Sequence, residues 1–288
     1  MVSTVPLYPV DWPGYCPVCA RDVTFRQQGP WLRDELVCTS CYSIPRLRAL
    51  VHVLTMVRPD WQRSVLWEMA PSGPSSAKLA AECPRYVGSQ YWSDVRPGDQ
   101  RGGVRCEDVE NPSFADGSVD VVVSSDVFEH VFDVDRAMQQ IARVLSPSGV
   151  HVWTTPQYGT LEVSKERVRR TADGIEHLVP AEYHGDPVND KGVLVTFDWG
   201  RDLPQRVQRA SGLTTTVYRI EAAHLGILGE FIEVFVSAKD PRAADLAMRA
   251  AGGQTSVPYT PSVAVRANRA LRARARPLKA HYRRLRGA

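Results

Sequence analysis

The sequence lacks a run of about 18 apolar residues, the length that a membrane-spanning helix needs. Its first residues, Met-Val-Ser-Thr-Val-Pro-Leu-Tyr-Pro, lack the basic start and the continuous apolar stretch of a secretory signal peptide. Residues 261–288 contain no acid but nine Lys or Arg, so the rest of a chain whose net charge is +3 is mildly acidic. We therefore expect a cytoplasmic protein whose main body does not bind nucleic acid through a broad positive surface.

The sequence has no internal repeat, and short apolar segments with the spacing of strands alternate with segments that have the spacing of helices. The expected strands are residues 64–69, 85–88, 104–106, 119–123, 150–155, 214–220 and 230–238, and the expected helices are residues 44–57, 75–82, 133–145 and 201–210. This alternation predicts an α/β fold, with a mainly parallel seven-stranded sheet and helices on both faces.

Composition divides the chain into three parts. Residues 1–44 are rich in Cys, Pro and Trp and are expected to form a small module, whereas residues 45–240 carry the alternating pattern. Within that domain, residues 157–197 are polar and rich in Tyr, His, Gly and Pro, and an irregular segment of this length is usually a lid or a binding element. Residues 241–288 form a basic tail rich in Ala and Arg.

Four cysteines in the first part have the spacing of a zinc site. Cys16 and Cys19 form one Cys-x2-Cys pair, and Cys38 and Cys41 form a second pair eighteen residues later. Two such turns can direct four sulfurs at one ion, which would make a closed structural site rather than a catalytic one. Two disulfides are the alternative, and we do not favour them in a chain without a secretory signal. Cys83 and Cys106 have no such partner and are expected to be buried.

The apolar run that begins at Val119 stops abruptly at Ser124, Ser125 and Asp126, and Glu129-His130 follow within a turn. A β-branched run of this kind is typical of a strand buried on both faces of a parallel sheet. Ligands of open α/β sheets bind just beyond the carboxyl ends of such strands, so the polar residues here are expected to face a pocket.

Together with five further segments, this stretch resembles the class I S-adenosylmethionine-dependent methyltransferases, in particular the methyltransferase type 11 group. The other segments are Val65–Gly73, Tyr86–Tyr91, Val104–Val109 and the pair Phe114–Asp120 and Arg143–Gly149. The resemblance covers roughly residues 64–155, and the cysteine pairs and the long polar segment extend it to a bacterial subgroup with an N-terminal four-cysteine zinc module. No Gly-x-Gly-x-x-Gly follows the first strand, which argues against a dinucleotide-binding domain.

The resemblance implies a Rossmann-like methyltransferase fold and S-adenosylmethionine as cofactor. The residues that it assigns to the cofactor are Glu68, Ala70, Pro71, Gly73, Gln90, Asp108, Val109, Ser125 and Asp126. Two positions depart from the pattern of the family. Ala70-Pro71 stands where the family has glycines, and Gln90 stands where the family usually has a carboxylate that binds the ribose hydroxyls.

Histidines are the candidates for catalysis. His130 follows the buried strand, and His177 and His184 lie in the long polar segment, where Asp186 could orient the imidazole of His184 as it takes a proton from a hydroxyl. The alternative is that these side chains only hold the segment together through hydrogen bonds. A sugar or aromatic acceptor could stack on the flat ring faces of Trp153, Tyr158 and Trp199.

The leading hypothesis is a methyltransferase that acts on a hydroxyl of a saccharide or related natural product, with His177 or His184 as the base. One alternative is an RNA methyltransferase that uses the zinc module to grip RNA, but Arg21, Arg26 and Arg33 of that module are balanced by neighbouring acids. Another is a non-catalytic cofactor-binding scaffold. The basic tail is expected either to be solvated or to contact an anionic membrane surface, so that the protein would be peripheral to the inner face of the membrane. The sequence does not indicate an oligomeric state.

Overall fold

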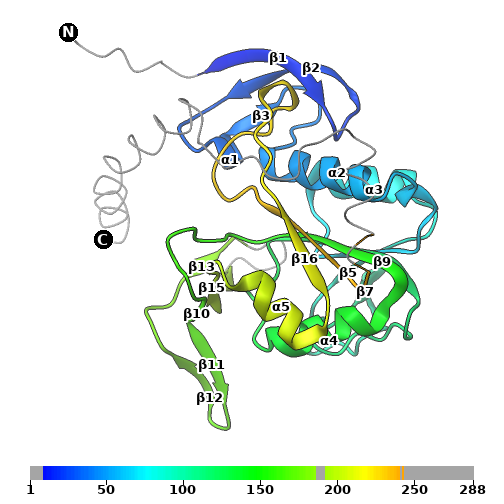
Figure 1. Cartoon of the computed structure of the whole chain (residues 1–288), viewed down its shortest axis with the longest axis vertical. Helices are drawn as coiled ribbons and strands as arrows, with labels where there is room; N and C mark the ends of the chain where they lie inside the picture. Colours follow the sequence, from blue (N-terminus) through cyan, green and yellow to red (C-terminus); the bar gives the residue numbers. More distant parts are fainter. Residues whose placement is uncertain (1–8, 186–191, 241, 243–288) are drawn as a thin grey trace.

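The computed structural model describes residues 9–185, 192–240 and 242 (Figure 1). Asp186 and nearly all of the predicted basic tail lie outside the described residues, so the predictions made for them stay predictions. Among the described residues, no helix has both the length and the apolar character needed to cross a bilayer.

An eight-stranded sheet forms the centre of the molecule, in the order β16-β17-β9-β8-β4-β5-β7-β6. Its strands are β4 (Leu66–Met69), β5 (Tyr86–Gln90), β6 (Gln100–Arg101), β7 (Val104–Cys106), β8 (Val119–Ser125), β9 (Leu145–Thr154), β16 (Thr214–Tyr218) and β17 (Val234–Ala238). The pairs from β9 to β7 are parallel, and β17 is antiparallel to β9. The predicted Rossmann-like α/β fold is thus confirmed.

The prediction of seven strands missed β6. This two-residue strand is antiparallel to β7 at the edge of the sheet. Gly102 and Gly103 connect the two strands, and both have positive φ (58° and 81°), a conformation that lets the chain reverse within two residues. A strand of two exposed residues has no apolar pattern by which the sequence could reveal it.

Helices cover both faces of the sheet (Figure 1). On one face, α2 (Pro45–Val57) and α3 (Gly73–Glu82) pack with Leu50, Leu54 and Leu79 in one hydrophobic cluster. On the other face, α4 (Val134–Val144) and α5 (Leu203–Ser211) contribute Ile141 and Val207 to a second cluster. Apolar side chains three or four residues apart explain why each helix turns one side towards the sheet.

The first part of the chain forms a separate three-stranded antiparallel sheet of β1 (Val10–Cys16), β2 (Arg21–Gln27) and β3 (Leu36–Cys38). The four-residue helix α1 (Leu32–Glu35) lies between β2 and β3 and was not predicted from the sequence. Cys83 and Cys106, outside this sheet, are buried as expected.

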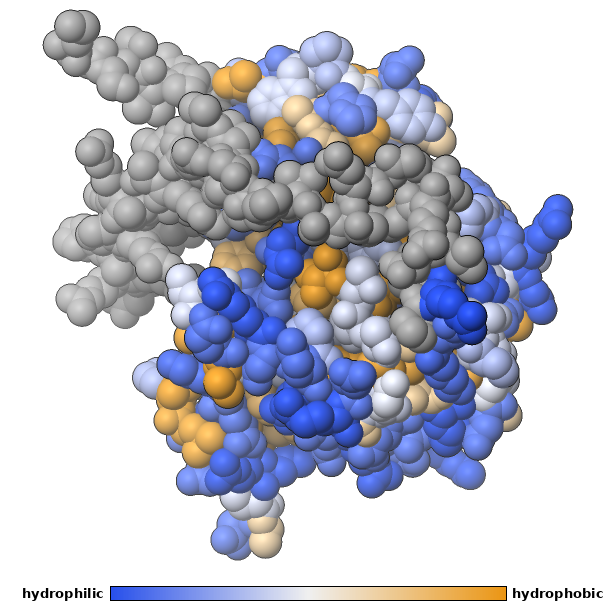
Figure 2. Space-filling view, in the orientation of Figure 1, coloured by the Kyte–Doolittle hydropathy of each residue, from blue (hydrophilic) through white to orange (hydrophobic). Residues whose placement is uncertain are grey.

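The predicted lid, residues 157–197, contains short strand pairs rather than a wholly irregular loop. These pairs are β10 (Lys165–Glu166) with β15 (Phe197–Asp198), β11 (Val168–Thr171) with β12 (Gly174–His177), and β13 (Tyr183–His184) with β14 (Val193–Leu194). The β11–β12 hairpin projects from the body (Figure 1). Figure 2 shows apolar surface over the lid, where the exposed side chains include Ile175, Leu178 and Tyr183.

Candidate functional site

The four predicted zinc ligands come together in the N-terminal sheet. The Sγ atoms of Cys16 and Cys41 are 3.7 Å apart, those of Cys19 and Cys38 are 4.0 Å apart, and all four lie within 4.8 Å of one another. Zn–S bonds near 2.3 Å in a tetrahedron place sulfurs about 3.8 Å apart. The four thiols therefore have the spacing that a tetrahedral zinc ion requires, and none of them is in a disulfide.

A buried cation lies next to the cysteine cluster. The guanidinium of Arg48 donates to the carbonyl oxygens of Leu36 (2.8 Å) and Gly226 (2.7 Å), and it lies over the ring of Phe25. Burial lowers the pKa of Arg48 to about 10, and the nearby cysteine thiolates oppose that shift. Because Gly226 belongs to the segment between β16 and β17, Arg48 also ties the cysteine module to the sheet.

The residues assigned to the cofactor lie along one edge of the central sheet. Strands β8, β4, β5 and β7 are neighbours and parallel, so their carboxyl ends meet at that edge. Ser125 ends β8 and Gln90 ends β5, while Asp108 and Val109 follow β7. Gln90 and Asp108 are half-buried, and burial raises the pKa of Asp108.

The loop between β4 and α3 keeps a backbone path that glycines usually provide. Ala70 has φ +50° and Gly73 has φ +72°, so the chain takes the left-handed conformation twice within four residues. Below this loop, the buried Glu68 accepts hydrogen bonds from the hydroxyls of Ser76 (2.7 Å) and Tyr86 (2.6 Å). The loop thus stays close to the sheet although Ala70-Pro71 replaces glycines, and the polar residues at this edge fit an adenosylmethionine molecule.

Asp126 immediately follows β8 and is held by two arginines that come from outside the methyltransferase-like segments. Arg33 of α1 forms an ion pair with it, and Nε of Arg46 lies 3.4 Å from Oδ2. The hydroxyl of Thr154 donates to Oδ1 (2.9 Å). Burial disfavours the charge of Asp126, yet the two guanidiniums hold its pKa below the usual range. Its φ of +54° is unusual for a residue other than glycine, so these contacts hold a strained backbone.

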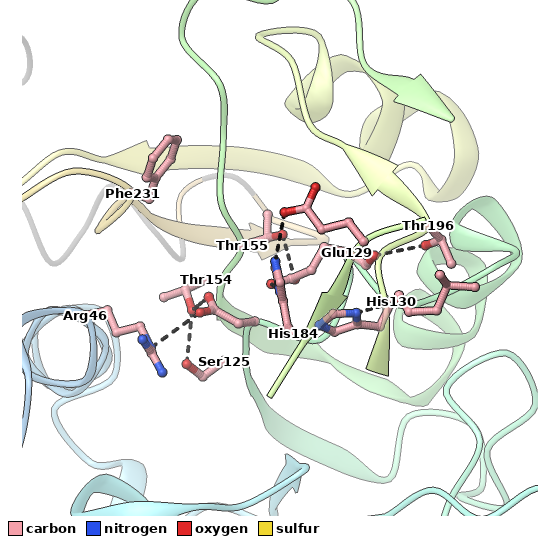
Figure 3. Close-up of polar contacts among 12 residues, drawn as sticks. Arg46, Ser125, Glu129, His130, Thr154, Thr155, His184, Thr196 and Phe231 are labelled. Carbon is pink, nitrogen blue, oxygen red and sulfur yellow. Dashed lines mark hydrogen bonds and ion pairs between the residues drawn. The ribbon is translucent and has the colours of Figure 1, made fainter. Parts of the chain in front are cut away.

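Beyond Asp126, three side chains with acid–base chemistry converge. Glu129 and His130 lie in the loop between β8 and α4, and β13 of the lid brings His184 close to them (Figure 3). Nδ1 of His184 lies 3.9 Å from Oε1 of Glu129, and its ring meets that of His130 edge-on at 5.1 Å. Burial, reinforced by the charge of Asp126, raises the pKa of Glu129 to about 8, and burial lowers the pKa of His184.

The lid is fixed to this loop by backbone contacts. The carbonyl of Leu194 lies 2.9 Å from Nδ1 of His130, and the amide and hydroxyl of Thr196 both donate to the carbonyl of Glu129 (2.7 and 3.0 Å). These contacts explain why residues some sixty positions apart in the chain share one site. They also fit the alternative prediction that hydrogen bonds hold the lid together.

Other predicted positions do not join this group. His177 is exposed on the projecting hairpin strand β12. Trp153 and Trp199 are fully buried, so the prediction that they stack with an acceptor is wrong. Both pack in the hydrophobic cluster on the α4 and α5 face of the sheet. The apolar side chains of that cluster surround each ring, so neither ring has a face left for an acceptor. Tyr158 is half-buried and lies edge-on to Phe231.

A cavity of about 590 Å³ lies beside Asp108, one of the predicted cofactor residues. It is bordered by Asp108, by the start of α4 and by lid residues, including Glu166 and Phe197. Arg136, Arg170 and Arg206 line it together with several acids. Glu129, His130 and His184 do not line this cavity.

Comparison with known proteins identifies the central segment. Residues 72–153 match the family described as a methyltransferase domain. This segment is therefore similar to the methyltransferase domain of that family. The matched residues include Gln90, Asp108 and the loop from Ser125 to His130.

One curated relative and many solved structures are similar to parts of the chain. The biotin biosynthesis bifunctional protein BioHC of Cellvibrio japonicus is 40% identical over 73 residues, which are 25% of this chain and 14% of that protein. An S-adenosylmethionine-dependent methyltransferase from Mesorhizobium loti has 17% identity and a TM-score of 0.42 over 66% of this chain and 96% of its own. A putative one from Listeria monocytogenes has 13% identity and a TM-score of 0.46 over 68% and 99%.

Sequence reasoning missed several residues that the structure brings to the site. Arg33, Arg46 and Thr155 carry no motif, since their positions depend on how the module and the sheet pack together. Glu129 stands beside the predicted His130 in the segment that ends the buried strand, so the sequence did contain a signal for it.

Proposed function

We propose that the protein transfers the methyl group of S-adenosylmethionine to a hydroxyl of a saccharide or related natural product, with His184 as the general base. The match to the methyltransferase domain family and the polar residues at the carboxyl edge of β8, β4, β5 and β7 support the cofactor. When bound, the cofactor would supply the activated methyl group. Gln90 and Asp108 would bind its nucleoside part, and the loop from Ala70 to Gly73 would approach its methionine part.

The position of His184 is the observation that carries the choice of base. Of the two lid histidines that the sequence proposed, only His184 lies at the edge of the sheet where β8 ends; His177 is exposed on the hairpin. Burial lowers the pKa of His184, so the imidazole is neutral near pH 7 and can accept a proton. A hydroxyl acceptor has to lose one proton during methyl transfer, which is what this group can take up.

We propose in addition that the four-cysteine cluster holds a structural zinc ion. The sulfur spacing supports this assignment, and four thiolates leave no position open for a substrate. The module supports a role in packing better than one in RNA binding, because Arg26 is paired with Asp11 and Arg33 is buried against Asp126. Neither the RNA nor the scaffold hypothesis gains support from the comparisons.

Calorimetric titration of the zinc-loaded protein with S-adenosylmethionine and S-adenosylhomocysteine tests the cofactor site. Micromolar binding, about −8 kcal/mol, is expected. Saccharides and hydroxylated natural products would then be screened as acceptors by release of S-adenosylhomocysteine. With an accepted substrate, kcat of His184→Ala should be at least ~100-fold below that of the wild type. The matched lid variant His177→Ala should keep the wild-type kcat. Equal losses in both variants, or no cofactor binding at millimolar concentration, would contradict the proposal.

A further inference from the structure

We infer that Glu129 positions His184 through its buried carboxylate. The carboxylate holds the imidazole in the tautomer and orientation in which Nε2 can take the proton of the substrate hydroxyl. This inference rests on the proposed function, because it explains how the proposed base is made ready. Glu129 lies in the loop after β8, whereas His184 lies in the lid, so the proposed base and its positioning residue come from different segments.

Glu129 is 1% exposed, and only one of its two carboxylate oxygens has a hydrogen-bond partner among the residues that the structure describes. Oε2 accepts from the hydroxyl of Thr155 (2.9 Å), while Oε1 has no hydrogen-bond partner among the described residues. Leaving a buried carboxylate oxygen unpaired is costly, and here the unpaired atom faces the proposed base, so we expect His184 to become its partner during function. Nδ1 of His184 lies 3.9 Å from this oxygen (Figure 3).

The backbone of Glu129 is coupled to the lid strand that carries His184. Thr196 binds the carbonyl of Glu129, and Val195 donates from its amide to the carbonyl of Glu182, two residues before His184. Residues 193–196 therefore contact both members of the pair. A small movement of this strand would bring Nδ1 within hydrogen-bond reach of Oε1, and catalytic hydrogen bonds are often long before the substrate binds.

The two nitrogens of His184 face different surroundings. Nδ1 faces the buried Glu129, whereas Nε2 lies on the side of Glu182, which is 47% exposed and paired with Arg167. An Nδ1–H that donates to the ionised Glu129 leaves the lone pair of Nε2 free. As the acceptor oxygen bonds to the methyl carbon, the sulfur–carbon bond breaks, the sulfonium becomes a neutral sulfide, and the hydroxyl proton moves to Nε2. The carboxylate then faces an imidazolium, which it stabilises.

The pair is active only when it holds a single proton, on Nδ1. Ionisation of Glu129 is therefore required, and activity should rise with pH as that carboxyl loses its proton near pH 8. Other ionisable groups act on the pair and set where this step falls. They are Arg33 from α1, Asp126 and His130 from the loop after β8, Tyr158 after β9, and Arg167 and Glu182 from the lid.

Histidine-labelled full-length protein, zinc-loaded and saturated with S-adenosylhomocysteine, allows an NMR titration of the seven histidines. The signal that disappears in His184→Asn is assigned to His184. In the wild type we expect the chemical shift of this signal to change with pH, with a midpoint near pH 8. Glu129→Gln should abolish this titration step because an amide cannot ionise. Glu182→Gln is the matched control: it removes the other carboxylate at 3.9 Å from the ring and should keep the step.

A step that persists in Glu129→Gln would overturn the inference. A second result would also overturn it: selective broadening of the His130 and His184 signals by one equivalent of Mn²⁺. These two residues and Glu129 offer ligand atoms within 4.8 Å of one another, so such broadening would show that the three side chains hold a cation instead. With an acceptor in hand, Glu129→Gln should lower kcat at least ~10-fold, leave the KM for S-adenosylmethionine unchanged, and remove the rise of activity towards pH 8. Methyl transfer that needs His184 but not Glu129 refutes only the inference, whereas the NMR step without any methyl transfer refutes only the proposed function.

Discussion

His151 illustrates at the scale of one residue how the core of the sheet responds to acid. It lies in β9, is fully buried, and its ring stacks on that of Trp153 at an interplanar angle of 9°. The hydroxyl of Ser124 lies 3.0 Å from Nε2, while Nδ1 has no hydrogen-bond partner among the described residues. Burial lowers the pKa of His151 to about 3. The folded protein therefore keeps this imidazole neutral, whereas the unfolded chain protonates it in mild acid.

His151→Gln should reduce the acid sensitivity of folding. As pH falls from about 6.5 towards 3, the unfolded state gains a proton at His151 that the folded state does not bind, so stability is lost across this window. Between pH 7 and pH 5 the wild type should lose ~1–2 kcal/mol more than the variant, because glutamine does not ionise. Thermal unfolding at both pH values measures the difference. The exposed His177→Gln should behave like the wild type, and equal slopes in His151→Gln and wild type would argue against this role.

At the scale of an element, the strand β13 is positioned by a glycine next to it in space. Gly192 has φ +76°, and a Cβ atom on it would lie 2.4 Å from the carbonyl oxygen of His184. Such a contact is far inside van der Waals distance, so the backbone of β13 would have to move. The short pairing of Tyr183–His184 with Val193–Leu194 offers few hydrogen bonds with which to resist that movement.

Gly192→Ala should therefore displace His184 and lower methyl transfer by at least ~10-fold, since small misplacements of a catalytic group have large kinetic costs. Cofactor binding should remain within a factor of two of the wild type, because the cofactor residues lie on other strands. Gly185→Ala provides the control, as a Cβ there would meet no atom of the described residues within 4 Å. The measurements are kcat with an accepted substrate and calorimetric titration with S-adenosylhomocysteine. Unchanged kcat in Gly192→Ala would show that β13 does not position the base.

At the scale of the whole molecule, the cysteine module contacts the loop after β8, where the proposed site lies. Its helix α1 supplies Arg33, which is buried, pairs with Asp126 and donates to the carbonyl of Phe231 (2.9 Å). Arg48 of α2 connects the same module to Gly226. Because Asp126 lies three residues before Glu129, we expect order in the module to affect the loop that faces the proposed base.

Loss of the proposed zinc ion should thus affect both folding and the site. Cys38→Ser is expected to bind less than one equivalent of zinc and to lose at least ~3 kcal/mol of stability, or roughly 10 °C in Tm. Cys83→Ser, outside the cluster, should keep the full metal content. Elemental analysis and thermal unfolding give the two quantities. A Cys38→Ser protein with wild-type Tm would show that the module does not depend on a metal.

The sequence predicted much of the scaffold but less of the site. Helix Pro45–Val57 appeared almost as expected from the spacing of Leu47, Leu50, Val51 and Leu54, and the buried run from Val119 is β8. These elements are encoded locally, by apolar period and by flanking turn residues. The short strands of the lid were not predicted, because two-residue pairs such as β13–β14 have no pattern of their own and form only where the body holds them.

The sequence by itself determined the α/β architecture, the four clustered cysteines and the order of the methyltransferase segments, since each depends on residue type and short spacing. Only the tertiary structure decided which histidine meets Glu129, that Trp153 and Trp199 are core residues, and that Arg33 pairs with Asp126. Contacts between residues far apart in the chain depend on how the elements pack. The periodicity of any one segment contains no information about its distant partner.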